Sequence, residues 1–179
     1  MAQQESGPDF RVITSSPSQT MQVGEALGRL APPGSVVCLR GNLGSGKTCL
    51  TQGIGRGLGV YGVIHSPTFV FINEHPNLST RPSLYHVDLY RVHDEADVLA
   101  LGLEDYMYGD GVTVIEWAER AEGLLPSDCL WVDIRYLDEH TRTLTFRPHG
   151  AAYVDLVTRL RNELVAADLA VASTPSAEW

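Results

Sequence analysis

The octapeptide at residues 41–48, G-N-L-G-S-G-K-T, restricts the possible folds of this chain more than any other segment. It matches the pattern G-x-x-x-x-G-K-[ST], whose glycines allow successive backbone N–H groups to turn toward a bound phosphate. An apolar run at residues 35–40 precedes it, and residues 47–58 follow with apolar side chains at helical spacing. A strand, a glycine loop and a helix in this order predict an α/β nucleotide-binding domain.

The rest of the chain predicts further strands and helices around this unit. We expect strands at residues 10–14, 35–40, 69–73, 84–87, 112–115, 130–136 and 141–147. We expect helices at residues 17–30, 47–58, 94–101 and 153–164. Gly53, Gly55 and Gly57 each cost a helix about 1 kcal/mol relative to alanine, so the second helix is expected to fray near its end, at residues 55–59. The predicted organisation is a disordered leader at residues 1–9, one domain built around the glycine loop at residues 10–166 and a flexible tail at residues 167–179.

Lys47 is the only lysine of the chain, which has twelve arginines. We expect its ammonium to reach the β- and γ-phosphates of a nucleotide, and the Thr48 hydroxyl to bind Mg²⁺. A glycine-rich turn without a ligand is the alternative, and it gives no reason for the sole lysine to stand there. The expected nucleotide-binding segment comprises Asn42, Leu43, Gly44, Ser45, Gly46, Lys47, Thr48 and Cys49.

Hydrolysis of a nucleotide also requires carboxylates that hold the metal and order a water. Asp88 and Glu116 each close an apolar strand, at the carboxyl end where α/β sheets place their ligands. We therefore expect Lys47, Asp88 and Glu116 to be catalytic, and Thr48, Asp88 and Glu116 to be the candidate metal ligands. The residues alone leave open which carboxylate touches Mg²⁺ directly, and a strand-end carboxylate that is only solvated is the alternative for either.

Other side chains near these motifs have less specific assignments. Residues 66–68, S-P-T, fit either a switch loop or an ordinary proline turn. Arg91 and Arg120 could bind the γ-phosphate or a partner's carboxylate, although a surface ion pair is the more ordinary role. The six histidines show no ligand spacing and receive no role.

The formal net charge of −9 disfavours an extended nucleic-acid surface, because it repels a phosphate backbone. Any RNA should therefore be presented by a partner. No apolar stretch reaches the roughly 18 to 20 residues that a membrane span requires, and the first residues lack a signal-peptide pattern. We expect a soluble, cytoplasmic protein that does not contact a membrane.

Together these motifs resemble the bacterial TsaE family of small ATPases. The resemblance rests on residues 41–48, S-P-T-F at 66–69, H-V-D-L-Y-R at 86–91, G-L-E-D-Y at 102–106 and I-E-W at 115–117, and it extends over residues 10–147. It implies a P-loop three-layer α/β sandwich with a mixed central sheet, ATP and Mg²⁺ as cofactors, and a role in making N6-threonylcarbamoyladenosine. The modified position is residue 37 of tRNAs that read codons beginning with A.

The resemblance also implies partners and further site residues. Members of the family bind a TsaB–TsaD complex that performs the transfer, their ATP hydrolysis supports its turnover, and tRNA is contacted only through these partners. Matching residues favours Glu116 as the metal ligand, places Trp117 beside the nucleotide, and assigns Pro17 and Thr20 to a segment near the base. We expect partner docking to order the loop that contains Thr68 over the γ-phosphate. With no obvious arginine finger, the isolated chain should be slow, since an arginine in trans can increase the rate about 10³- to 10⁵-fold.

Three other functions are consistent with a P-loop. A small-molecule or nucleotide kinase usually carries an arginine-rich lid, which this chain lacks. A GTPase switch would have D-x-x-G and N-K-x-D motifs, and neither is found. A module that uses nucleotide only to gate assembly would bind ATP without needing a catalytic Glu116.

Overall fold

The computed structural model describes residues 7–173 of the chain. The expectations for residues 1–6 and 174–179, a disordered leader and the end of a flexible tail, lie outside these residues. Within residues 7–173, none of the helices is both long and apolar enough to span a membrane.

One mixed sheet of eight strands forms the centre of the fold, in the order β3-β4-β5-β2-β6-β7-β1-β8. Strands β4, β5, β2 and β6 are parallel neighbours, and every other neighbouring pair is antiparallel. The strands are β1 (Phe10–Thr14), β2 (Val36–Arg40), β3 (Ile72–His75), β4 (Leu84–Asp88), β5 (Val112–Glu116), β6 (Cys129–Tyr136), β7 (Arg142–His149) and β8 (Ala170–Ser173). The helices are α1 (Pro17–Leu30), α2 (Lys47–Leu58), α3 (Glu95–Ala100), α4 (Leu103–Met107), the 3₁₀ helix η1 (Ala118–Leu124) and α5 (Ala151–Ala166).

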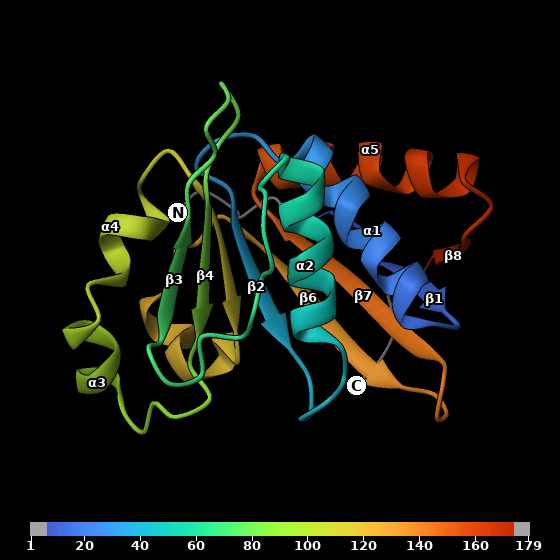
Figure 1. Cartoon of the computed structure of the whole chain (residues 1–179). Coiled ribbons are helices and arrows are strands. Elements are labelled where there is room, and N and C mark those ends of the chain that lie inside the picture. The colour runs from blue at the N-terminus through green and yellow to red at the C-terminus, as the bar shows by residue number, and fades with distance from the viewer. Residues whose placement is uncertain (1–6, 174–179) are drawn as a thin grey trace.

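Two apolar cores lie on opposite faces of this sheet, because alternate residues of a strand point to opposite sides. In β2, Val37 and Leu39 belong to the core shared with α1, α2 and α5, whereas Val36 and Cys38 belong to the core shared with α3, α4 and η1. Figure 1 shows α1 and α2 side by side across the sheet, with α3 and α4 near β3 and β4. Helices on both faces of a mixed sheet confirm the predicted three-layer α/β sandwich.

Helices α1 and α2 pack closely through glycines. A Cβ atom added at Gly24 would lie 2.3 Å from the carbonyl oxygen of Leu50, and one added at Gly53 would lie 2.2 Å from that of Met21. Helix α2 is regular to its end, where Gly59 caps it in the left-handed conformation with φ 81°. The expected fraying of α2 is therefore wrong, because these glycines let the two backbones approach and the packing stabilises the helix.

Other differences from the predicted elements lie in loops and at the sheet edge. Strand β3 begins at residue 72 rather than 69, because residues 68–70 form a turn and Phe71 after it has a positive φ of 65°. Residues 170–173, expected to belong to a flexible tail, form β8 and pair with β1. The sequence pattern also did not predict the short helices α4 and η1.

Candidate nucleotide-binding site

The carboxyl ends of β2, β5 and β4 meet at one edge of the sheet, because these neighbouring strands run parallel. Asp88 and Glu116 occupy paired positions at the ends of β4 and β5, and the glycine loop continues from β2 into α2. A cavity of about 350 Å³ opens between them, within the range of about 300 to 1,000 Å³ typical of small-molecule clefts. Its lining consists of Leu43, Gly44, Gly46, Lys47, Thr48, Cys49, Ser66, Thr68, Asp88, Tyr90, Glu116 and Trp117.

The glycine loop presents polar groups without protein partners. Gly44 and Gly46 take φ values of 75° and 110°, which residues with a Cβ rarely adopt. Gly46 is also the N-cap of α2 and provides no side-chain cap, so the first N–H groups of the helix lack that acceptor. The Ser45 hydroxyl is buried and has no hydrogen-bond partner within residues 7–173. An anion bound at the start of α2 would supply acceptors for the N–H groups of its first turn.

The ammonium of Lys47 is held against the loop. Only 4% of this residue is exposed. Its Nζ donates to the carbonyl oxygens of Gly41 at 2.7 Å and Asn42 at 3.0 Å, and it lies 3.9 Å from the centre of the Trp117 ring. Burial lowers the pKa of the Lys47 ammonium, whereas Glu116, the largest of the opposing charges, acts to raise it. The single lysine is therefore buried in the cavity beside both the loop and an acidic strand end.

Glu116 lies between the loop and β4. One carboxylate oxygen, Oε2, accepts a hydrogen bond from the Thr48 hydroxyl at 3.1 Å. The other, Oε1, is 2.8 Å from Nε2 of His86, a fully buried residue of β4. Both oxygens of a nearly buried carboxylate are thus held in defined positions. We assigned no role to any histidine from the sequence, although the alternation of β4 places His86 on the same face as Asp88 and offered a way to find it.

The Asp88 carboxylate is hydrogen-bonded to the loop at residues 66–68. Its Oδ2 accepts from the hydroxyls of Ser66 and Thr68, the latter at 2.9 Å, and its Oδ1 accepts from the backbone N–H of Tyr90 at 2.9 Å. The two predicted acidic residues are therefore not equivalent. Glu116 contacts the first turn of α2 directly, whereas Asp88 fixes the loop that borders the cavity.

The remaining predicted residues divide into two groups. Asn42 contributes its carbonyl oxygen to Lys47, and Ser45 is buried beneath the loop, so neither lines the cavity. Pro17 and Thr20 also lie outside the lining. The Pro17 carbonyl accepts from the Cys49 thiol at 3.2 Å, and the buried Thr20 hydroxyl is 2.8 Å from that of Thr14. Pro17 and Thr20 thus flank the start of α2 instead of facing the cavity.

Arg91 and Arg120 pack on aromatic rings near the cavity. The guanidinium of Arg91 is 4.6 Å from the ring centre of Phe69, and that of Arg120 is 5.8 Å from that of Trp117. Arg120 also donates to the carbonyl of Val92 at 2.6 Å. Neither arginine forms an ion pair within residues 7–173, so the expectation of a surface ion pair is wrong for both.

The cavity residues fit a nucleoside triphosphate with Mg²⁺. The loop offers N–H donors and an ammonium for phosphate oxygens, and Thr48 and Glu116 offer two of the oxygen ligands that Mg²⁺ prefers. Within residues 7–173, no cluster of three or more His, Cys, Asp or Glu side chains could hold a metal. Mg²⁺ here would therefore take its other ligands from phosphate oxygens and water, as it usually does.

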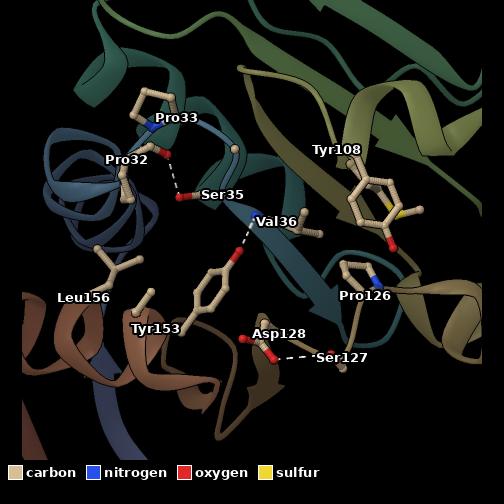
Figure 2. A pocket seen from close by; sticks show the side chains of 13 residues that line it. Pro32, Pro33, Ser35, Val36, Tyr108, Pro126, Ser127, Asp128, Tyr153 and Leu156 are labelled. Carbon is tan, nitrogen blue, oxygen red and sulfur yellow. Dashed lines mark hydrogen bonds between the residues drawn. The ribbon is translucent and has the colours of Figure 1, made fainter.

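A second cavity, of about 410 Å³, lies at the opposite end of β2 (Figure 2). Its lining includes prolines and tyrosines beside small polar and aliphatic residues, and the Tyr153 hydroxyl accepts from the Val36 N–H at 2.8 Å. Asp128 is the only charged residue of the lining. None of the residues predicted from the sequence lies there, so the groups suited to phosphate chemistry belong to the first cavity.

Comparisons with known proteins agree on one family. The sequence pattern of the family described as "Threonylcarbamoyl adenosine biosynthesis protein TsaE" matches residues 14–144. A Bacillus subtilis protein named tRNA threonylcarbamoyladenosine biosynthesis protein TsaE is 39% identical over 147 residues, which is 82% of this chain and 90% of that protein. A Streptomyces coelicolor protein of the same name is 46% identical over 112 residues, 61% of this chain and 74% of that protein.

A solved structure has the same fold. The crystal structure of YdiB from Bacillus subtilis superposes with a TM-score of 0.75 at 31% sequence identity. The match covers 91% of this chain and 99% of that one. The similarity therefore extends well beyond the glycine loop and includes nearly the whole sheet and its helices.

Proposed function

Because this chain belongs to the TsaE family of threonylcarbamoyl adenosine biosynthesis proteins, we propose that it binds and hydrolyses ATP to support this modification of tRNA. One observation carries the proposal. The sole lysine of the chain, the Thr48 hydroxyl and the Glu116 carboxylate converge in one cavity at the end of the parallel strands, beside a glycine loop that leads into the uncapped N-terminus of α2.

Different residues of the cavity bind the phosphates and the metal of Mg²⁺–ATP. Lys47 exchanges the carbonyls of Gly41 and Asn42 for the β- and γ-phosphates, which are stronger acceptors because they are charged. Thr48 and Glu116 hold Mg²⁺, and Glu116 is the direct carboxylate ligand because it already contacts Thr48. When bound, Mg²⁺ would supply positive charge that stabilises the negative charge on the phosphates during hydrolysis.

Asp88 and the loop it fixes line the cavity that would hold the γ-phosphate. Because Asp88 accepts from Ser66, Thr68 and the N–H of Tyr90, it holds the loop close to the cavity, and it places a second carboxylate in the lining beside Glu116. Its part in hydrolysis is to order the attacking water and the loop hydroxyls. Trp117 closes the cavity beside Lys47.

The rim of the cavity suits a protein partner. Leu43 is 71% exposed, Phe69 79% and Val70 63%. These three residues belong to the two loops that border the nucleotide cavity, and exposed apolar side chains gathered at a rim are typical of protein interaction sites. We propose that a TsaB–TsaD complex docks on this rim, shifts the loop at residues 66–69 over the γ-phosphate and accelerates hydrolysis. With a net charge of −9, the chain would contact tRNA only through these partners.

The test is ATP hydrolysis with Mg²⁺, measured for the isolated chain and with TsaB–TsaD. We expect slow turnover alone and stimulation by the partners, and we expect Lys47→Ala and Glu116→Ala to abolish both. Glu139→Ala is the matched control, because Glu139 is an exposed carboxylate in the turn between β6 and β7 and should behave as wild type.

Two outcomes of this test would contradict the proposal. ATP that binds but is not hydrolysed in any mixture would indicate a module that gates assembly. Fast turnover that ignores the partners would instead call for phosphate-transfer assays with nucleosides and nucleotides, which detect a kinase.

A further inference from the structure

We propose that His86 is a positioning residue that fixes the Glu116 carboxylate in the orientation needed to bind Mg²⁺ with Thr48. The inference rests on the proposed function and adds a residue to its site. It starts from the position of His86 in β4, two residues before Asp88 and on the same face of the strand.

The hydrogen bonds around Glu116 give each carboxylate oxygen one protein donor. His86 Nε2 is 2.8 Å from Oε1, and the Thr48 hydroxyl donates to Oε2 at 3.1 Å. Both carboxylate and imidazole are almost completely buried. With Oε1 anchored to β4, Oε2 is the oxygen directed toward the start of α2, where Thr48 lies.

The tautomer of His86 follows from its partner. A carboxylate oxygen accepts hydrogen bonds, so we assign the proton to Nε2 of His86, which then donates to Oε1. The other ring nitrogen, Nδ1, is buried and has no hydrogen-bond partner within residues 7–173. At this fully buried strand position an aliphatic side chain would leave no polar atom of its own unpaired. However, an aliphatic side chain could not donate a hydrogen bond to Glu116.

Donors of this kind tune metal sites in general. A group that orients a metal ligand without touching the metal usually changes metal affinity by about 10- to 100-fold when it is removed. Without the bond from His86, the Glu116 side chain could rotate, and Oε2 would no longer be held toward Thr48. The glycine loop and Lys47 would be untouched, so binding of nucleotide without Mg²⁺ should not depend on His86.

A pair of amide variants separates this role from packing. The amide nitrogen of His86→Gln can reach the position of Nε2, whereas that of His86→Asn is too short and matches Nδ1. Calorimetry would measure binding of a non-hydrolysable ATP analogue to the full chain, without Mg²⁺ and over a Mg²⁺ titration. Thermal unfolding of each variant would be recorded alongside.

We expect His86→Asn to raise the half-saturating Mg²⁺ concentration by about 10- to 100-fold and to leave nucleotide binding without Mg²⁺ unchanged. We expect the half-saturating Mg²⁺ concentration of His86→Gln to lie close to that of wild type. Equal Mg²⁺ requirements for wild type and His86→Asn would overturn the inference while leaving the proposed function intact. The inference would also be overturned if both variants lost nucleotide affinity in proportion to their loss of thermal stability, and by the same factor with and without Mg²⁺. A wild-type chain that binds no nucleotide at all would instead contradict the proposed function.

Discussion

Replacing Gly53 by alanine tests whether the contact between α1 and α2 sets the position of the glycine loop. Gly53 lies in the middle of α2, the helix whose first residues are Lys47 and Thr48. The added Cβ would lie 2.2 Å from the carbonyl oxygen of Met21 and 2.9 Å from the Cα of Gly24. Both are backbone atoms of α1, so the clash can be relieved only if the helices move apart.

The magnitude follows from two opposing effects. Alanine favours a helix over glycine by about 1 kcal/mol, whereas overpacking typically costs about 1 to 3 kcal/mol, and a rigid backbone neighbour places this site at the upper end. The expected net loss is about 1 to 2 kcal/mol, which for a domain of this length lowers Tm by about 2 to 8 °C. Because α2 would move away from α1, ATP binding should weaken as well.

Thermal unfolding and ATP affinity of Gly53→Ala would be compared with those of Gly55→Ala in the same helix. A Cβ at Gly55 would meet the Cδ1 atom of Ile64 at 2.1 Å, which is the end of a flexible side chain that can turn away. We expect a clearly smaller loss for Gly55→Ala. A Gly53→Ala variant as stable as wild type, or a Gly55→Ala variant equally destabilised, would refute the reasoning.

Three further predictions concern the nucleotide site, its rim and the second cavity. Because the Trp117 ring lies 3.9 Å from Lys47 Nζ, ATP binding should change the fluorescence of Trp117. Trp117→Phe should abolish this fluorescence change even though Trp131 is still present. Val70→Asp places a charge on an exposed apolar rim, so it should weaken TsaB–TsaD stimulation more than ATP binding by the isolated chain, and equal losses would contradict docking there. Burial raises the pKa of the Tyr153 hydroxyl in the folded chain to about 12, whereas the pKa of the same hydroxyl in the unfolded chain is the ordinary 10.0. The native state then holds a proton that the unfolded state has lost, so urea unfolding should show stability falling as pH rises through this window. Tyr153→Phe should flatten that fall, and an unchanged slope would assign it to another group.

The sequence predicted the parts of the site that strand and loop patterns determine. A buried strand before the glycine loop and two strands ending in Asp88 and Glu116 required these groups to meet at one sheet edge, which the structure confirms. The family match also confirms the resemblance inferred from the motifs. Both predictions depended on periodicity and short motifs, which are local properties of a chain.

The features that the sequence missed depend on contacts between distant segments. The glycines of α2 suggested a weak helix end, because their packing against α1 appears only in three dimensions. Strand β8 has a composition typical of a flexible tail and is ordered through its pairing with β1. His86 was overlooked because its partner Glu116 lies on another strand, thirty residues away.

Reconstituted tRNA modification, with TsaB–TsaD, ATP and Mg²⁺, is the most direct test of the proposal that ATP hydrolysis in this cavity supports threonylcarbamoyladenosine formation. The quantity to measure is the modified nucleoside formed per TsaB–TsaD complex. We predict repeated turnover with the wild-type chain, and no more than a single round with Lys47→Ala or Glu116→Ala. Repeated turnover with either variant, or with the chain left out, would contradict the account.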